Sequence, residues 1–235
     1  MDLSKNNVDI YNGIIKTDQD VYDNYNNFIF SNDARIFNKM IKRSEIYLNV
    51  KNIVGDILEF GVFKGASLSL WCKLINMYEP NSITKVIGFD YFNSEEVIDN
   101  LNGLNKSMME NVISRVQKCD LSIESVQKKL SIFNPSKYKL IKGDAVLTSK
   151  VFVNDNPGLK IKLLYMDLDV GEPTYKILLN LWNKISVGGI IVFDEYAYHQ
   201  WDESIGVDNF LKTIKGEYEQ FPTHIYSPTF YIKKI

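Results

Sequence analysis

The sequence is poor in the residues that crosslink secreted folds or bind zinc, with two cysteines and two histidines in 235 residues. Cys72 and Cys119 lie far apart in the sequence, so we expect neither a disulfide framework nor a cysteine-based zinc site. His199 and His224 are likewise too few for a zinc centre. This cysteine usage fits a reducing compartment, and we expect a cytoplasmic protein.

The sequence also lacks long apolar runs and an excess of basic residues. No stretch approaches the roughly 18 apolar residues of a membrane span, and residues 1–13 have no apolar core of a signal peptide. The formal net charge of -2 shows that the sequence lacks the excess of positive charge that is typical of nucleic-acid-binding proteins. We therefore expect neither a membrane nor a nucleic-acid partner. With 45% hydrophobic residues, the chain can bury the core of one large α/β domain.

Apolar segments that end in an acid alternate with helical patterns along most of the chain. The predicted strands cover residues 56–60, 85–90, 137–145, 161–169 and 190–196. The predicted helices cover residues 66–77, 122–130, 173–186 and 205–214. This alternation predicts a mostly parallel sheet with helices on both faces. Residues 223–234 alternate as two short strands and would form an antiparallel edge.

Two segments fall outside this alternation. Residues 20–50 carry apolar residues at three-to-four spacing, which predicts helix, whereas residues 1–20 are expected to be loose. We assign residues 1–50 to an N-terminal helical extension, which either covers the cofactor as a lid or packs as an ordinary helix. Residues 51–235 form one compact domain in this interpretation. Within it, the polar and irregular residues 91–112 are interpreted as an insertion that shapes a substrate pocket.

The most informative motif is GDILEFGVFKGASLSLW, residues 55–71. An apolar strand runs into a tight glycine turn from Gly61 to Gly65 and then into an amphipathic helix, as in the first β-α unit of a nucleotide-binding fold. The GxxxG spacing lacks the third glycine that lets a helix N-terminus approach a pyrophosphate. The turn therefore suits a cofactor without phosphates, and S-adenosylmethionine (SAM) is the commonest one.

Acids at the strand ends predict the cofactor half of a site, because ligands bind outside the carboxyl ends of parallel strands. Asp90 is placed to accept both ribose hydroxyls, a role that fits NAD as well as SAM. Asp144, next to Ala145, is placed to accept the adenine amino group. Glu59 and the Gly61 turn favour SAM, whose amino-acid end needs acceptors and free backbone groups. A helix cap or a fixed turn is the alternative role for each acid.

Four further acids follow the fourth and fifth strands. Asp167 and Asp169 leave the same face of one strand, and Asp194 and Glu195 follow the next strand. Neighbouring strands lie roughly 4.8 Å apart, so these carboxylates repel one another unless a cation or protons compensate. A hard divalent ion such as Mg²⁺ prefers oxygen ligands of this kind. A metal-free general base among solvated acids is the alternative.

Four sequence blocks together resemble the macrocin O-methyltransferase-like family of class I SAM-dependent methyltransferases, which methylate sugar hydroxyls with Mg²⁺. The blocks are GDILEFGVFKGASL, GFDYF, MDLDVGEPT followed by VGGIIVFDEY, and W-x4-G-x-D-x-F, in family order. The blocks span about residues 45–215, and the resemblance implies a Rossmann-like class I methyltransferase fold with a mostly parallel seven-stranded sheet. It implies cofactor contacts by Glu59, Gly61, Lys64, Ser67, Asp90 and Asp144, and we include Gly65, Ala145 and Asp167 in that site. It also implies Mg²⁺ ligation by Asp167, Asp194 and Glu195, with Asp169 as the general base.

The sequence departs from the family pattern at two positions. Glu195 stands where the family usually has a second aspartate, and Gly171 stands where it often has an aromatic residue. Glutamate still ligates Mg²⁺, but its extra methylene moves the ligand oxygen by about one bond length. The aromatic residues that follow the acid pair would stack on a sugar face or form a hydrophobic lip; they include Tyr196, Tyr198 and Trp201.

We expect a SAM-dependent O-methyltransferase that acts on a sugar hydroxyl of a secondary-metabolite glycoside or of a surface-polysaccharide precursor. The substrate would be a sugar or a nucleotide sugar, and a homodimer is left open. The runner-up is a metal-independent SAM methyltransferase acting on a phenol or on a phosphorylated or nitrogen-bearing metabolite. An NAD-dependent oxidoreductase is disfavoured by the missing GxGxxG and by the lack of a Tyr-x-x-x-Lys pair. A non-catalytic SAM-binding protein would not need the acids after the fourth and fifth strands.

Overall fold

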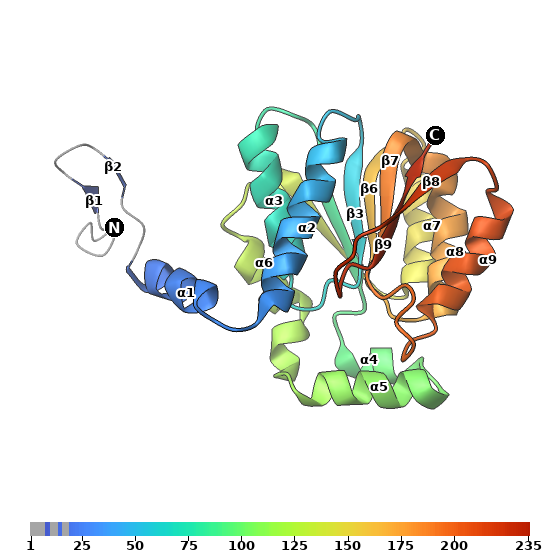
Figure 1. Ribbon diagram of the computed structural model, residues 1–235, viewed down its shortest axis with the longest axis horizontal. Coiled ribbons are helices and arrows are strands. Elements are labelled where there is room, and N and C mark those ends of the chain that lie inside the picture. The colour runs from blue at the N-terminus through green and yellow to red at the C-terminus, as the bar shows by residue number, and fades with distance from the viewer. Residues whose placement is uncertain (1–7, 10–13, 16–18) are drawn as a thin grey trace. The chain divides into compact units, whose positions relative to one another are not determined.

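The computed structural model describes residues 8–9, 14–15 and 19–235 (Figure 1). The chain divides into two compact units, Met1–Phe37 and Asn38–Ile235. The described part of the smaller unit holds two short paired strands, β1 (Val8–Asp9) and β2 (Ile14–Ile15), and helix α1 (Gln19–Ile29). Most of the N-terminal segment expected to be loose therefore lies outside the described residues.

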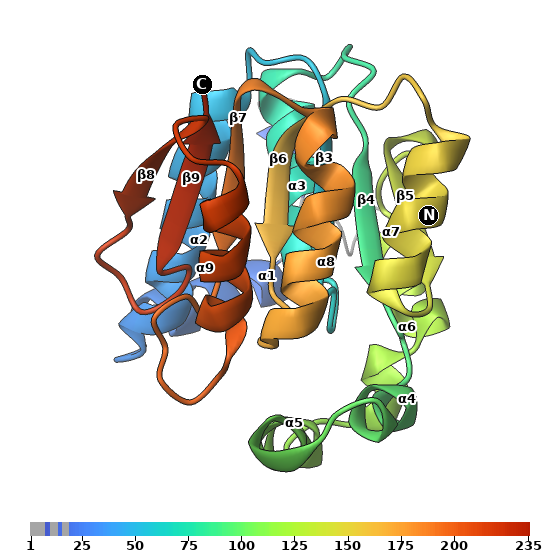
Figure 2. The same cartoon turned by 90° about the vertical axis from the view of Figure 1, so that its right-hand side faces the viewer.

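A seven-stranded sheet forms the centre of the larger unit, in the order β5-β4-β3-β6-β7-β9-β8 (Figure 2). Its parallel strands are β3 (Asp56–Phe60), β4 (Val86–Asp90), β5 (Tyr138–Lys142), β6 (Ile161–Met166) and β7 (Ile185–Phe193). The antiparallel strands are β8 (Tyr218–Pro222) and β9 (Phe230–Lys234). The strand order reverses between β3 and β6, where ligands bind in folds of this kind. The predicted class I methyltransferase fold is confirmed.

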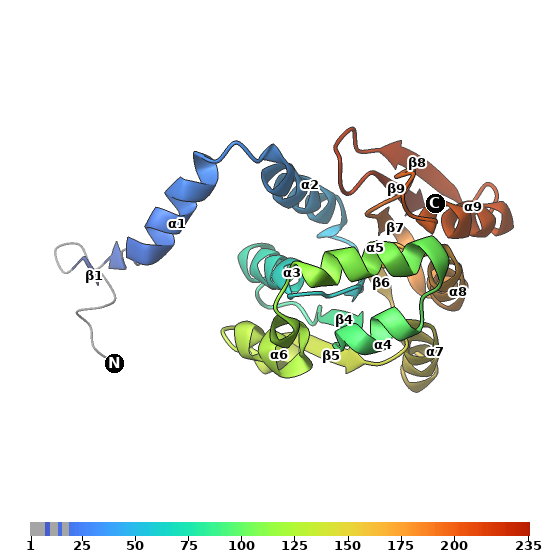
Figure 3. The same cartoon turned by 90° about the horizontal axis from the view of Figure 1, so that it is seen from below.

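Helices cover both faces of the sheet, as Figure 3 shows from below. One face carries α2 (Ala34–Val50), α3 (Ala66–Tyr78) and α6 (Ile123–Leu130). The other carries α7 (Ala145–Asp155), α8 (Gly171–Leu181) and α9 (Glu203–Thr213). Strand side chains alternate between the two resulting cores, so that Ile57 packs with Trp71 on one face and Leu58 with Ile177 on the other.

The expectation of irregular structure over residues 91–112 was wrong. The segment forms α4 (Ser94–Asp99) and α5 (Gly103–Ser114), which lie beyond the carboxyl ends of the strands (Figures 2 and 3). Asn93 begins α4 by accepting hydrogen bonds from the backbone of Glu95 and Glu96. The many polar residues of this segment obscure its helical pattern, although Leu104, Met108 and Val112 recur at four-residue spacing in α5. Apolar residues of α5 such as Met109 and Val112 line a cavity.

Several predicted boundaries also needed correction. The predicted strand over residues 137–145 ends at Lys142, and α7 was not predicted. Strand β7 begins at Ile185, where a helix was expected to continue, and the first strand of the tail begins at Tyr218. The single N-terminal helix is in fact α1 and α2, separated by residues 30–33. None of the helices in the described ranges combines the length and the apolar character that a membrane span requires.

Two glycines set the distance between α8 and α9. A Cβ atom on Gly206 would lie 1.9 Å from the carbonyl oxygen of Gly171, and one on Gly171 would lie 2.4 Å from that of Asp202. The backbone N–H of Gly171 also donates to the Asp202 carboxylate at 2.8 Å. The close helix contact therefore explains why this chain has glycine, and no aromatic side chain, at position 171.

We expect Gly206→Ala to lower the free energy of unfolding by about 2–3 kcal/mol, because the added methyl group must push α9 away from α8. This corresponds to a fall in Tm of roughly 4–12 °C for a chain of this size. Thermal unfolding followed by circular dichroism measures it. The matched control is Gly158→Ala, because a Cβ at Gly158 meets no heavy atom within 4 Å. Equal Tm values for the two variants would contradict the assigned helix contact.

Candidate active site

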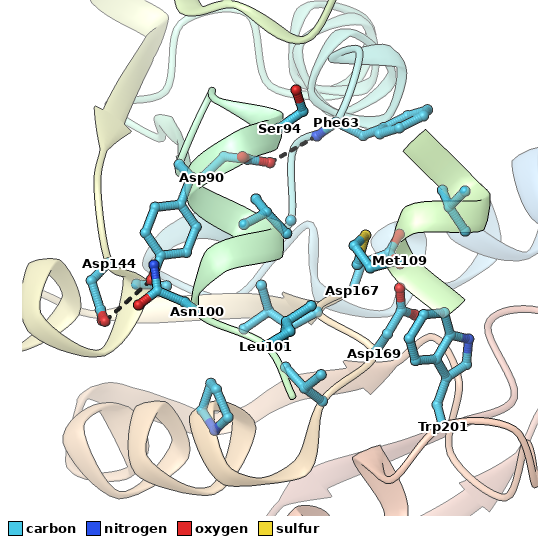
Figure 4. Close-up of a pocket in the computed structure, with 18 of the residues that line it drawn as sticks. Phe63, Asp90, Ser94, Asn100, Leu101, Met109, Asp144, Asp167, Asp169 and Trp201 are labelled. Atoms are coloured by element: carbon cyan, nitrogen blue, oxygen red, sulfur yellow. Dashed lines mark hydrogen bonds between the residues drawn. The ribbon is translucent and has the colours of Figure 1, made fainter. Parts of the chain in front are cut away.

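A cavity of about 690 Å³ lies at the carboxyl ends of the parallel strands (Figure 4). This volume is in the range of small-molecule sites. Figure 4 shows Asp90 and Asp144 on one side and Asp169 with Trp201 on the other. Eight of the predicted site residues line it: Gly61, Asp90, Asp144, Ala145, Asp167, Asp169, Asp194 and Glu195. The cavity thus joins the predicted cofactor half to the predicted acidic half.

In the cofactor half, Asp90 holds the glycine turn in place. Its carboxylate accepts hydrogen bonds from the backbone N–H groups of Val62 at 2.8 Å, Phe63 at 3.0 Å and Phe92 at 2.8 Å. Gly61 has a φ of 89°, and a Cβ there would lie 1.9 Å from the Asp167 carbonyl oxygen. A carboxylate offers about four lone-pair positions, so Asp90 keeps acceptor capacity toward the cavity. Burial raises the pKa of Asp90 above its ordinary value.

Asp144 begins helix α7, which is the alternative role raised for it above. One carboxylate oxygen accepts hydrogen bonds from the backbone of Val146 at 2.8 Å and Leu147 at 3.1 Å. The other accepts from the Tyr91 hydroxyl at 3.3 Å. The carboxylate is therefore both a helix cap and part of the cavity wall. Its contact with adenine stays a prediction.

Four predicted cofactor residues lie outside the cavity lining: Glu59, Lys64, Gly65 and Ser67. Glu59 is fully buried and accepts hydrogen bonds from the Ser67 hydroxyl and, at 2.6 Å, from the Trp71 indole. Burial raises the pKa of Glu59 to about 7. Lys64 forms an ion pair with Asp120 at 3.0 Å. These contacts hold the glycine turn and α3 in place from outside the cavity lining. Direct contact of the four residues with a cofactor stays a prediction.

In the acidic half, the four predicted acids all reach the cavity. Asp169 has a φ of 66°, a left-handed backbone conformation that is uncommon outside glycine and concentrated at functional sites. Burial, and then the charges of Asp167 and Glu195, raise the pKa of Asp169 well above its ordinary value. Burial and the Asp194 charge raise the pKa of Asp167 to about 6 and that of Glu195 to about 8.

Asp194 differs because two cations from α2 face it. Lys39 Nζ lies 2.6 Å from Asp194 Oδ2 and 3.7 Å from Asp167 Oδ2. Arg43 Nη2 lies 3.4 Å from Asp167 Oδ2 and 3.7 Å from Asp194 Oδ1. Although burial acts in the opposite direction, Lys39 and Arg43 lower the pKa of Asp194. Hydroxyls of Tyr165 and Ser227 also donate to this carboxylate.

These four partners of Asp194 were not predicted from the sequence. Lys39 and Arg43 are spaced four residues apart on a predicted helix, so their shared face was readable from the sequence. Their target was not, because 155 residues separate Lys39 from Asp194. Tyr165 lies within a strand, and Ser227 lies in the tail. The sequence around Tyr165 and around Ser227 contains no pattern that predicts a contact with Asp194.

A fifth carboxyl group, that of Glu203 on α9, lies behind the predicted acids. It accepts a hydrogen bond from the Glu195 backbone N–H at 2.9 Å. Burial, and then the Asp169 charge, raise the pKa of Glu203 well above its ordinary value. Within the described part of the chain, Glu203 Oε1 and Glu195 Oε2 are buried without a hydrogen-bond partner. The acidic half therefore holds five carboxyl groups and two facing cations, Lys39 and Arg43, and the raised pKa values favour protonation of the other acids when no further cation is present.

The donor set fits a hard divalent cation in its chemistry. All three predicted ligands offer carboxylate oxygens, and one Glu195 oxygen is buried without a hydrogen-bond partner. Burial and then the nearby charges of Asp194 and Asp167 raise the pKa of Glu195, so a cation there would favour its ionised form. As the side chains stand, however, no group of three His, Cys, Asp or Glu residues in the described ranges has an arrangement that could hold a metal ion. Lys39 contacts two of the predicted ligands, Asp167 and Asp194.

Comparison with known proteins agrees with this architecture. A family model described as Macrocin-O-methyltransferase (TylF) matches residues 34–215. No curated protein sequence matches the chain.

Solved structures of three methyltransferases share the fold. The structure of CalS11, a TDP-rhamnose 3'-O-methyltransferase of calicheamicin biosynthesis, has a TM-score of 0.61 at 24% identity, over 83% of this chain and 78% of that one. The O-methyltransferase NovP has a TM-score of 0.63 at 23% identity, over 83% and 80%. An O-methyltransferase from Bacillus cereus, in complex with SAH, has a TM-score of 0.53 at 13% identity, over 100% of both chains. Since the family model covers well over half of the sequence, the chain belongs to the macrocin-O-methyltransferase (TylF) family of SAM-dependent O-methyltransferases.

Proposed function

We propose that this enzyme transfers the methyl group of SAM to a hydroxyl of a sugar. The observation that carries the proposal is one cavity in which the Gly61 turn and Asp90 face the acids that follow β6 and β7. CalS11, which shares the fold, is described as acting on a nucleotide-linked rhamnose, and this supports a sugar acceptor. The sugar would belong to a secondary-metabolite glycoside or to a surface-polysaccharide precursor. A homodimer and a cytoplasmic location stay predictions of the sequence.

The cofactor half binds and orients the methyl donor. Asp90 accepts the ribose hydroxyls with its remaining lone pairs, and Asp144 accepts the adenine amino group. Methyl transfer needs the acceptor oxygen in line with the S–CH₃ bond, so positioning supplies much of the rate. Trp201, which lines the cavity beside Asp169 (Figure 4), offers an aromatic surface for one sugar face.

In the acidic half, Asp169 takes the proton of the acceptor hydroxyl. A carboxylate at its ordinary pKa is a weak base. Burial and neighbouring charges raise the pKa of Asp169, so its carboxylate is a stronger base when it is ionised, and a divalent cation nearby would favour that ionised form. Asp167, Asp194 and Glu195 would hold Mg²⁺. A divalent cation bound there supplies Lewis acidity, which lowers the pKa of a sugar hydroxyl, and charge that offsets the carboxylates.

Calorimetric titration of S-adenosylhomocysteine (SAH) tests the cofactor half. We expect wild-type protein to bind SAH and Asp90→Asn to bind it about a hundredfold more weakly. The reason is that charge-assisted hydrogen bonds to the ribose are each worth about 1.5–3 kcal/mol. Asp155→Asn, at the exposed end of α7, is the matched control and should bind like wild type. Folded wild-type protein that fails to bind SAH would contradict the proposed function.

A second titration, with a panel of sugars and nucleotide sugars in saturating SAH, tests the acidic half. We expect the affinity for one acceptor to rise when Mg²⁺ is added. If SAH binds but Mg²⁺ changes the affinity for no acceptor, the proposed role of Mg²⁺ in acceptor binding is contradicted. That result would favour the metal-independent alternative, an enzyme acting on a non-sugar metabolite.

A further inference from the structure

The carboxylates that follow β6 and β7 already have a cation, and α2 supplies it. Lys39 and Arg43 are four residues apart, so their side chains leave the same face of the helix. The Lys39 ammonium contacts both Asp194 and Asp167. These are two of the three residues that we propose as ligands of a divalent cation.

Asp194 has little room for another partner. Its Oδ2 atom accepts hydrogen bonds from Lys39 at 2.6 Å and from the Ser227 hydroxyl at 2.5 Å. Its Oδ1 atom accepts from the Tyr165 hydroxyl and lies 3.7 Å from Arg43. The side chain is 1% exposed, so it does not turn outward to offer a free oxygen. A metal ion that binds Asp194 must therefore approach a carboxylate with three hydrogen-bonding partners, whose remaining position faces the Arg43 guanidinium, and must come close to the Lys39 ammonium.

Lys39 is the partner best able to leave. The side chain of Arg43 is 10% exposed, and its guanidinium lies 4.5 Å from the centre of the Tyr165 ring, so it is held on two sides. The hydroxyls of Tyr165 and Ser227 belong to buried residues. The Lys39 side chain is 24% exposed and lines the cavity, and four flexible methylenes carry its ammonium.

We propose that the Lys39 ammonium takes the place of the divalent cation in the metal-free enzyme and competes with it for Asp194 and Asp167. Metal binding displaces Lys39 into the cavity, because an ammonium and a divalent cation within a few ångströms repel each other strongly. The competition lowers the apparent metal affinity and keeps the carboxylates paired when no metal is present. This inference rests on the metal ligation in the proposed function.

The test is the affinity of the full chain for Mn²⁺ alone, measured by electron paramagnetic resonance of the free ion. We expect Lys39→Met to bind Mn²⁺ at least about tenfold more tightly than wild type, since the competing charge is gone. Lys39→Arg keeps a cation and should stay within about twofold of wild type. Lys42→Met is the matched control on the same helix, because Lys42 pairs with Glu45 and does not line the cavity.

The outcomes show whether the competition by Lys39, the proposed metal site or both must be given up. Equal Mn²⁺ affinity in wild type and Lys39→Met would overturn the competition and leave the metal ligation standing. No Mn²⁺ binding by either protein would overturn both. Binding by Lys39→Met alone would support the competition in its strongest form.

A measurement on wild-type protein covers the case in which Lys39→Met does not fold. Acetylation of individual lysines by a water-soluble anhydride is followed by mass spectrometry, with and without saturating Mn²⁺. We expect Mn²⁺ to speed the acetylation of Lys39 relative to Lys42, because displacement exposes its amine. An unchanged ratio of the two rates would overturn the competition.

Discussion

Asp169→Asn is expected to lower turnover by about a hundredfold to ten-thousandfold while SAH affinity stays at the wild-type level. An amide accepts no proton, and a positioned general base contributes a factor of this size. Asparagine also tolerates the left-handed backbone conformation, a φ of 66°, that residue 169 adopts. The variant should therefore change the chemistry without changing the loop. Steady-state kinetics with SAM and an unmethylated acceptor sugar measures the first effect, and SAH calorimetry measures the second.

The stability of Asp169→Asn provides an internal check. Burial and neighbouring acids disfavour the charged form of Asp169, so a neutral side chain should leave Tm unchanged or raise it. Asp155→Asn, which removes an exposed carboxylate from the same chain, should affect neither turnover nor Tm. Wild-type turnover in Asp169→Asn would remove this residue from the role of base. A loss of SAH affinity would instead show that it supports the cofactor half.

Asp194→Ala is expected to cause the largest loss of stability among single carboxylate changes at the site. It leaves Lys39 and Arg43 to share Asp167, and it leaves the buried hydroxyls of Tyr165 and Ser227 without this acceptor. Removing one partner of a buried ion pair costs about 3–5 kcal/mol. For a chain of this size that corresponds to a fall in Tm of roughly 6–20 °C. Activity and its dependence on Mg²⁺ should be lost together.

Asp194→Asn separates the contributions of charge and hydrogen bonding. Asparagine restores an acceptor for one hydroxyl but no charge, so its Tm should lie between those of wild type and Asp194→Ala. Calorimetric unfolding and kinetics in Mg²⁺ or in chelator measure both properties. Full wild-type activity in chelator would contradict the proposed metal site. A wild-type Tm for Asp194→Ala would show that the pairing with α2 does not stabilise the fold.

The sheet could be predicted because its central strands are buried on both faces. Segments such as 161–166 are therefore almost continuously apolar and are followed directly by an acid, here Asp167. Helices α4 and α5 were not predicted because many polar residues surround their apolar ones, although Leu104, Met108 and Val112 in α5 recur at helical spacing. Helix α7 was not predicted either, because the residues before Ala145 resemble a strand that ends in Asp144. Strand ends were misplaced by a few residues, because an acid marks the edge of a sheet only approximately.

The site was predictable to the extent that sheet topology places strand ends together. Asp90, Asp167, Asp169 and Asp194 line one cavity for that reason. Which way a buried carboxylate faces is a different question, because it depends on contacts with neighbouring helices. Glu59 follows the pattern but forms hydrogen bonds with α3, away from the cavity. The cations that face Asp194 come from a helix 155 residues away, and no local pattern records that pairing.

The long separations around Asp194 have a consequence for the order of folding. Its hydrogen-bonded partners include Lys39, 155 residues earlier, and Ser227, 33 residues later. The family match ends at residue 215, before β8 and β9. A nascent chain of that length already contains every proposed reacting group, yet it lacks the strand that pairs with β7 and the hydroxyl that orients Asp194. Contacts between distant segments form slowly, so we expect docking of the final strand pair to complete the proposed catalytic centre.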